Sequence, residues 1–269
     1  MIGGTIMKKV FLPMCSLFLT ACSLMNITGG NTTNILSISV KNSGVSLAIS
    51  EKQSFEKPSQ SLSVKEVPQF EETTYGVLPS QEILDNEDTP YSYGAYTTES
   101  NNKIMMYFKY TFYIKNTGNV FAAYNLKILL NEKYKSEGDT RSLADTLRVM
   151  VYENDVNNDS KNSVHTMTIF AKEAAEYNID KDGNRTRREF VASYHYLNQE
   201  DDEHPLATSF IDETTIAVYN RIEFGKDDIR RYTLVVWLEG EDPQSEYLEE
   251  APSGSSISLT INIGGYIKG

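Results

Sequence analysis

Oxygen donors spaced as in a calcium-binding loop are the residues of this chain best placed to do chemistry. Asn178, Asp180 and Asp182 occupy positions one, three and five of such a loop, Gly183 occupies position six, and Glu189 occupies position twelve. Oxygens at alternate positions can converge on one Ca²⁺ when a glycine lets the backbone turn sharply between them. The spacing therefore makes calcium binding by this segment a hypothesis.

The same segment also fits a plain polar hairpin. Asp182-Gly183 is a typical turn dipeptide, and it would join strands around 167–177 and 189–196. Arg185 stands where calcium loops carry an apolar anchor, and the arginines that follow it would repel a dication. A weaker copy at 155–160 lacks both the glycine and the acidic twelfth residue. These mismatches favour the hairpin, and we assign no metal ligand from the sequence.

Cys22 is the other position with distinctive chemistry, because it follows the parts of an export signal. Lys8 and Lys9 precede a mostly apolar run, Val10–Leu19, which is too short to span a bilayer. The residues Leu19-Thr20-Ala21-Cys22 resemble the lipoprotein signal of bacteria, which implies a diacylglycerol thioether on Cys22. An ordinary secretory signal cut near Ala21 and a retained buried segment are the alternatives.

These features place the mature chain outside the cytoplasm, either secreted or at the outer face of the bacterial cell membrane. Acyl chains on Cys22 would hold it there, since each buried methylene contributes about 0.8 kcal/mol. Cys15 and Cys22 are the only cysteines and both lie in the signal, so the mature chain has no internal disulfide and must rely on its core. The formal net charge of −12 disfavours nucleic acid as a partner.

No local pattern marks a catalytic centre. The sequence has no Gly-x-Ser-x-Gly elbow, no phosphate-binding glycine loop, no dinucleotide fingerprint and no cysteine in the mature chain. His165, His195 and His204 lie on separate segments without the His-Glu-x-x-His spacing of zinc peptidases. We therefore expect a protein that is not an enzyme and that needs no cofactor.

Aromatic and acidic clusters offer weaker hypotheses. An exposed group of tyrosines could stack on sugars, although tyrosine equally suits a half-buried sheet face, and packing is the favoured interpretation. Trp237 is expected in the core. Glu239, Glu241 and Asp242 are expected in a solvated turn, with a cation or a basic partner as the alternative. The tyrosines are Tyr91, Tyr93, Tyr96, Tyr107, Tyr110 and Tyr113.

Apolar residues alternate with polar ones along most of the chain after residue 103, which is typical of half-buried β-strands. The first two such segments flank the turn residues 116–119 and predict a long hairpin. A short helical turn is expected near 142–146. The alternating segments are 106–114, 120–130, 147–151, 215–219, 232–238 and 257–263.

These elements predict an all-β fold, a two-sheet antiparallel sandwich of the jelly-roll or immunoglobulin-like kind. Residues 1–22 form the export signal, with translation starting at Met1 or Met7. Residues 23–102 hold a predicted hairpin over 34–50 and then a long polar surface segment. Residues 103–269 form the sandwich, with which the hairpin is expected to pair; a domain boundary near 103 is the alternative.

Four segments of the chain resemble the TasA and camelysin class of exported proteins of Bacillota. The resemblance covers most of 103–264, and it implies a jelly-roll-like sandwich, a surface location and, in some members, assembly into matrix fibres by exchange of an N-terminal strand. The matching segments are Asn34-Ile-Leu-Ser-Ile-Ser-Val-Lys, Phe112-Tyr-Ile-Lys-Asn-Thr-Gly, Ser142-Leu-Ala-Asp-Thr-Leu-Arg-Val and Tyr232-Thr-Leu-Val-Val-Trp-Leu-Glu-Gly-Glu-Asp-Pro.

The sequence and this resemblance together lead us to expect a non-catalytic structural or adhesive protein of the cell surface, related to biofilm-matrix subunits. Its partners would be the membrane, through the lipid on Cys22, and either copies of itself or a component of the matrix or cell wall. The alternative is a lipid-tethered extracellular module that binds a glycan, a peptide or a cation.

Overall fold

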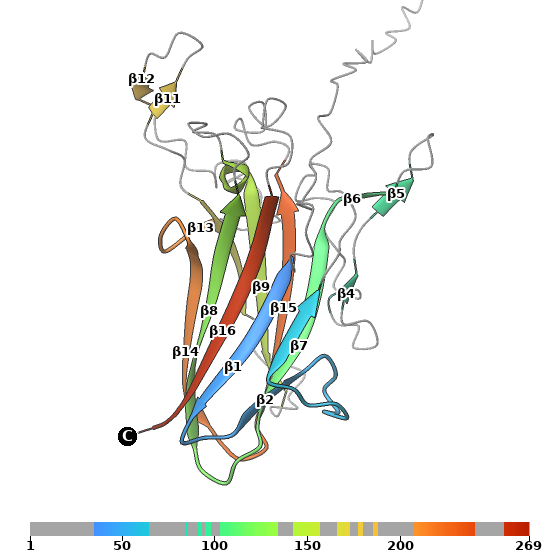
Figure 1. Cartoon of the computed structure of the whole chain (residues 1–269), viewed down its shortest axis with the longest axis vertical. Helices are drawn as coiled ribbons and strands as arrows, with labels where there is room; N and C mark the ends of the chain where they lie inside the picture. The colour runs from blue at the N-terminus through green and yellow to red at the C-terminus, as the bar shows by residue number, and fades with distance from the viewer. Residues whose placement is uncertain are drawn as a thin grey trace, which may run out of the picture.

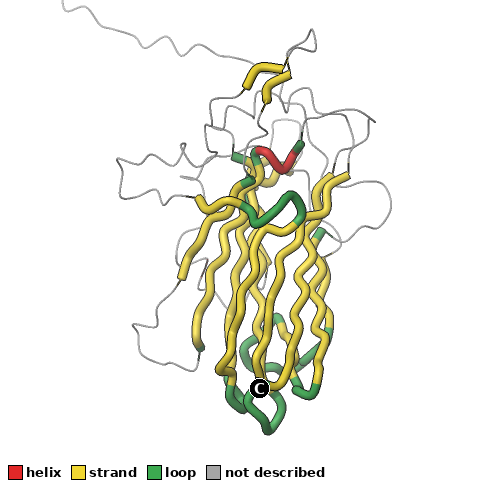
Figure 2. Tube along the Cα trace, turned by 90° about the vertical axis from the view of Figure 1, so that its left-hand side faces the viewer, coloured by secondary structure: helices red, strands yellow, loops and turns green. Residues whose placement is uncertain are grey.

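The computed structural model of the chain describes residues 35–64, 84, 91–92, 95–97, 103–133, 142–156, 166–172, 177–179, 185–187, 207–239 and 256–268. Over these residues two β-sheets pack face to face, which confirms the predicted all-β sandwich (Figure 1). The predicted helical turn is the 3-10 turn η2 (Leu143–Asp145), which is capped by Ser142. Figure 2 shows this turn, in red, at the end of the sandwich opposite the C-terminus.

The smaller sheet has five strands. Its order is β14 (Thr215–Phe224), β8 (Ala122–Lys133), β16 (Ser256–Ile267), β1 (Leu36–Ser43) and β3 (Ser61–Val64). β1 runs parallel to β16, with Leu36 opposite Leu259 and Ser43 opposite Tyr266, and the other neighbours are antiparallel. The chain therefore enters β1 at the end of the sandwich where β16 begins, and β16 finishes at the opposite end.

The larger sheet has seven strands. Its order is β13 (Ala207–Ser209), β10 (Thr166–Ala171), β9 (Leu147–Asp155), β15 (Ile229–Leu238), β7 (Phe108–Asn116) and β2 (Leu47–Ser50), and β4 (Tyr91–Ser92) also pairs with β7. β13 is parallel to β10. Two short antiparallel pairs complete the described strands, β5 (Ala95–Thr97) with β6 (Lys103–Met105) and β11 (Tyr177–Ile179) with β12 (Arg185–Arg187). Each main sheet is thus mixed, with one parallel pair among antiparallel ones.

The hairpins predicted over 34–50 and over 106–130 are instead crossings between the layers. β1 and β2 lie in different sheets, so residues 44–46 carry the chain from one sheet to the other. Gly44 makes this possible with a φ of 74°, and a Cβ there would lie 2.8 Å from Ile267 Cδ1. A strand with alternating residues buries the same side chains whether the next strand pairs with it in the same sheet or packs against it from the other sheet. The alternation therefore could not distinguish a hairpin from a crossing between sheets.

The second crossing joins β7 to β8 and is organised by Asn116. Its side-chain amide is buried and donates hydrogen bonds to the carbonyl oxygens of Val120 and Phe224, each at 2.9 Å. Its Oδ1 accepts a hydrogen bond from the backbone N–H of Gly118 at 3.0 Å. A backbone that leaves a sheet loses its ladder partners, and here one amide side chain replaces several of them.

The main core fills the space between the two sheets and uses the apolar face of each alternating segment. The rings of Phe112 on β7 and Tyr232 on β15 stack there with centroids 5.5 Å apart. Burying each large apolar side chain contributes about 1.5–3 kcal/mol, so this interior dominates the stability of the fold. Other members are Leu36, Ile38, Tyr110, Ile114, Leu126, Ile128, Val149, Val151, Leu234, Leu259, Ile261 and Ile263.

Candidate functional site: the open face of the five-stranded sheet

The outer faces of the two sheets differ sharply in exposure. On the seven-stranded sheet, the outward-pointing residues Lys109, Arg148 and Arg231 are at most 5 % exposed, and Thr111 and Thr233 are also buried. The alternation over 106–114 predicted a half-buried strand, and this prediction is wrong for most of β7 because Lys109 and Thr111, on the face opposite the main core, are buried as well. Among the residues that the structure describes, the five-stranded sheet is therefore the one with a broad face open to solvent.

Trp237 and Glu239 belong to the covered face. Trp237 is fully buried, as expected, but it lies in a second apolar cluster with Leu84 and Val235 instead of in the main core. Its Nε1 donates a hydrogen bond to Glu239 Oε2 at 3.0 Å. Glu239 is only 2 % exposed, so the prediction that it lies in a solvated turn is wrong. Arg231 Nη2 donates to the carbonyl oxygen of Leu84, which fastens residue 84 to this sheet.

The tyrosines whose side chains the structure describes form no exposed platform. Tyr107, Tyr110 and Tyr113 are all buried, which agrees with the packing interpretation. Tyr110 Oη donates to Glu51 Oε1 at 2.7 Å, and burial raises the pKa of this phenol. Sugar stacking on this group of tyrosines therefore receives no support from these three positions.

Short polar side chains cover the open face of the five-stranded sheet. They occupy the positions that alternate with core residues, and most carry a hydroxyl or an amide. Lys41 and Lys127 are exposed there, and none of the described residues that point outward from the regular part of this sheet is acidic. Glu223, at the bulged end of β14, instead forms an ion pair with Lys268 at 3.1 Å. The outward residues are Ser37, Ser39, Lys41, Ser61, Ser63, Asn125, Lys127, Leu129, Asn131, Val218, Asn220, Ser258, Thr260, Asn262, Gly264 and Tyr266.

The register arranges these residues in rows that run across the strands. The Lys127 row consists of Val218 on β14, Lys127 on β8, Asn262 on β16, Ser39 on β1 and Ser61 on β3. Ser39 Oγ donates to Asn262 Oδ1 at 3.1 Å within this row. Hydrogen bonds between neighbours hold such short side chains in fixed orientations, so the row presents a defined pattern of donors and acceptors.

The Lys41 row lies next to it and consists of Asn220 on β14, Asn125 on β8, Gly264 on β16 and Lys41 on β1. Gly264 leaves a gap in the row that the amide of Asn125 overlies, since a Cβ at 264 would be 2.8 Å from Asn125 Oδ1. Tyr266, two residues farther along β16, is 37 % exposed. The two rows and Tyr266 together bring amides, hydroxyls, two ammonium groups and one aromatic ring to one surface.

On the other side of the Lys127 row from the Lys41 row lies a further row, Leu129 on β8, Thr260 on β16, Ser37 on β1 and Ser63 on β3, and side-chain hydrogen bonds link it to Asn131 of the next row. Ser37 Oγ and Thr260 Oγ1 are 3.3 Å apart, and Asn131 Nδ2 donates to Thr260 Oγ1 at 3.0 Å. The surface is thus continuous along β16 from Thr260 to Tyr266.

Between the sheets, a polar cluster ties the two layers together. Arg221 on β14 donates through Nε to Glu153 Oε1 at 2.7 Å and through Nη2 to Glu153 Oε2. Tyr232 Oη donates to Glu153 Oε1 at 3.2 Å, and Tyr124 and Tyr232 hydroxyls are 2.9 Å apart. Hydrogen bonding to Glu153 raises the pKa of Arg221. Because the two charges neutralise each other across the layers, the cluster serves as a brace between the sheets.

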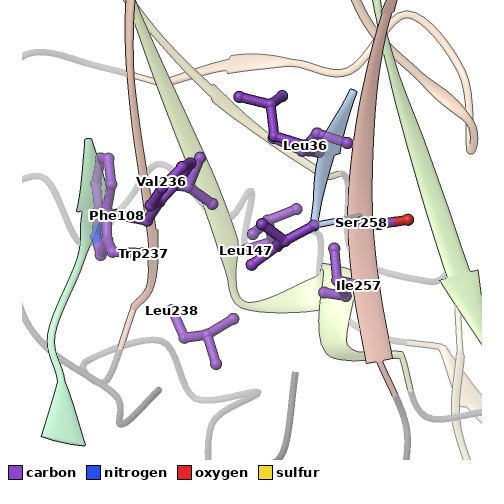
Figure 3. Close-up of a pocket in the computed structure, with 10 residues that line it drawn as sticks. Leu36, Phe108, Leu147, Val236, Trp237, Leu238, Ile257 and Ser258 are labelled. Carbon is purple, nitrogen blue, oxygen red and sulfur yellow. The ribbon is translucent and has the colours of Figure 1, made fainter. Parts of the chain in front are cut away.

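An apolar cavity opens between the sheets at the end where the chain enters β1. The space there that no atom fills is about 400 Å³ when open solvent is counted, and the enclosed part is much smaller. Figure 3 shows Leu36, Leu147, Val236 and Ile257 around it, while the side-chain oxygen of Ser258 points away from them. The cavity can hold an apolar group but offers no polar side chain to orient it.

Of the four residues in the calcium hypothesis, the structure describes only Asn178. It lies on β11 and pairs with Thr186 of β12 in an antiparallel ladder. Asp180, Asp182 and Glu189 lie outside the described residues, as do Cys22, the three histidines, Glu241 and Asp242. Within the described ranges, no group of three or more His, Cys, Asp or Glu side chains is arranged to hold a metal ion. No helix in the same ranges is long and apolar enough to cross a membrane.

Comparison with known proteins assigns no family, because no protein-family model and no curated protein matches the sequence. The resemblance to the TasA and camelysin class therefore stays a prediction. The open face was not identified from the sequence either. Its signal was present in Ser256-Ile-Ser-Leu-Thr-Ile-Asn-Ile-Gly, where small polar residues fill every second position.

Proposed function

We propose that this chain is a non-catalytic structural or adhesive protein of the bacterial cell surface, anchored through a lipid on Cys22, that contacts its surroundings through the open face. The observation that carries the proposal is the contrast between the two sheets. One outer face is covered by the chain itself, and the other presents ordered rows of hydroxyl and amide groups to solvent. Neutral polar groups that both donate and accept hydrogen bonds suit adhesion better than chemistry.

Two further observations support the anchoring and the orientation. The residues around Cys22 follow the lipoprotein pattern. The chain enters β1 at the end of the sandwich that bears η2, so a tether before residue 35 would leave the length of the open face extending away from the membrane.

Fractionation of cells that express the full chain tests this proposal. Wild-type protein should partition with membranes, be cut by protease added to intact cells and remain with the isolated matrix. Cys22→Ala should lose membrane partition and acylation while keeping its fold. Wild-type protein that stays in the cytoplasm, or a Cys22→Ala protein that is still acylated, would contradict it.

A second candidate function, a lipid-tethered module that binds a peptide, is favoured by the apolar cavity. Leu36, Leu147 and Ile257 would surround one apolar side chain of such a peptide. Leu147→Trp should fill the cavity with its larger side chain and leave no room for the peptide. If this variant no longer binds peptide but cell adhesion is unchanged, the peptide-binding function would be favoured over the adhesive one.

A further inference from the structure

We propose that the open face binds an acidic polysaccharide, laid across the Lys127 and Lys41 rows. This inference rests on the proposed function, in which the open face is the contact surface, and it names the class of partner. The residues that would make the contact are Lys41, Lys127, Asn125, Asn262 and Tyr266.

Charge is distributed unevenly between the open face and the rest of the chain. The chain has 37 acidic residues and a net charge of −12, yet the outward positions described on the regular part of this sheet include two exposed lysines and no carboxylate. A polyanion is repelled by an acidic surface and attracted to a local region of opposite sign. The open face is therefore where a negatively charged polymer can approach this protein, and the acidic remainder would orient it there.

Hydrogen-bonding chemistry narrows the polymer to a polysaccharide. A sugar presents hydroxyls that donate and accept, and the amides of Asn125 and Asn262 and the hydroxyl of Ser39 can do both. The Ser39–Asn262 hydrogen bond at 3.1 Å fixes these groups before a ligand arrives, so less ordering is needed on binding. A polymer recognised by charge alone would not need this neutral array.

Shape and aromatic character agree with this class. The amide of Asn125 lies over Gly264 in the Lys41 row, and the exposed ring of Tyr266 follows two residues along the same strand. The apolar face of a sugar ring can lie on such a ring while its hydroxyls reach the amides. A carboxylate on the sugar would then meet Lys41 on β1 or Lys127 on β8, the two strands on either side of β16.

Binding of the full chain, in non-ionic detergent, to immobilised polygalacturonate tests the inference. Dextran serves as the neutral polymer and single-stranded DNA as a polyanion that is not a polysaccharide. We expect binding to polygalacturonate that weakens as salt is added, and much weaker binding to the other two. Equal binding to dextran would overturn the requirement for acidity, and equal binding to DNA would overturn the assignment to polysaccharides.

Matched charge reversals locate the site. Lys41→Glu with Lys127→Glu should weaken binding to polygalacturonate about tenfold or more, because each change replaces an attraction by a repulsion. Lys52→Glu with Lys226→Glu alters two exposed lysines outside the open face and should change affinity less than about twofold. If the Lys41→Glu, Lys127→Glu variant has a lower melting temperature than the wild type, the Lys41→Ser, Lys127→Ser variant is tested in its place. That variant should also bind polygalacturonate more weakly. Wild-type affinity in the folded open-face variant would overturn the site.

A neutral substitution separates hydrogen bonding from charge. Asn262→Ala should weaken binding to polygalacturonate without changing the dependence on salt. If the chain binds no polysaccharide but cells that display it still adhere through its open face, this inference is wrong and the proposed function stands.

Discussion

Arg221 and Glu153 join the two sheets through a bidentate pair, with Arg221 on β14 of the smaller sheet and Glu153 on β9 of the larger one. The Glu153 side chain is 7 % exposed and that of Arg221 is 32 % exposed, so solvent reaches the pair from one side only. The pair closes the side of the sandwich along β14.

Glu153→Gln should therefore destabilise the fold. It leaves a partly buried guanidinium without its counter-ion and weakens the bond from Tyr232, and we expect a loss of about 2 kcal/mol after allowing for solvent screening. Glu223→Gln breaks the exposed pair with Lys268 and should cost about 0.5 kcal/mol or less. Urea unfolding of both variants measures the difference, and equal effects would show that the inter-sheet pair has no special weight.

Stability should fall at alkaline pH. Burial raises the pKa of Tyr124, Tyr219 and Tyr232 above the usual value of 10.0. Unfolded tyrosines lose their protons near that pH while the folded ones keep theirs, so their contribution is complete below pH 10.0 and is lost as the pH rises further. Each such tyrosine lowers the free energy of unfolding by about 1.4 kcal/mol for each pH unit between its pKa in the unfolded chain and its pKa in the folded protein. Unfolding curves on either side of pH 10.0 test this, with Tyr124→Phe expected to reduce the slope.

Two neighbouring glycines should respond differently to alanine. A Cβ at Gly265 would lie 2.7 Å from Leu47 Cδ1 and 2.9 Å from Val45 Cγ2 in the core, so Gly265→Ala should cost about 1–3 kcal/mol. At Gly264 the new Cβ meets the end of the Asn125 side chain, which can rotate away. Gly264→Ala should therefore be milder in thermal unfolding and should weaken polysaccharide binding instead. If Gly264→Ala destabilises the protein more than Gly265→Ala, the assignment of Gly265 to the core face of β16 and of Gly264 to its open face is wrong.

Calcium should have little effect on the β11–β12 pair if it is a plain hairpin. We expect no heat in a calorimetric titration with millimolar calcium and no rise in melting temperature. Binding that Asp180→Asn with Asp182→Asn abolishes would restore the calcium hypothesis.

The strands were predictable because burial on one face imposes a period of two. Leu147, Val149 and Val151, or Ile257 to Ile263, show that period directly. The pairing of β1 and β2 was not predictable, because the same alternation serves a strand beside its neighbour or opposite it. Mixed pairing, with β1 parallel to β16, depends on contacts between residues more than two hundred positions apart.

The two outer faces were harder still. Lys109 and Arg231 look like solvent-facing residues in the sequence, yet both are buried, and Arg231 donates a hydrogen bond to Leu84, more than a hundred positions away in the chain. On the open face, by contrast, Asn262 is exposed and Ser39 is partly exposed. Which of two polar faces is covered is decided by tertiary contacts that alternation does not contain.

Adhesion of cells that display the full chain to their own isolated matrix tests the central claim most directly. Ser39→Glu with Asn262→Glu, which places two carboxylates in the Lys127 row, should strongly reduce adhesion at equal surface display, whereas Lys52→Glu with Lys226→Glu should leave it unchanged. Undiminished adhesion by the folded Ser39→Glu, Asn262→Glu protein would contradict the assignment of the open face as the working surface.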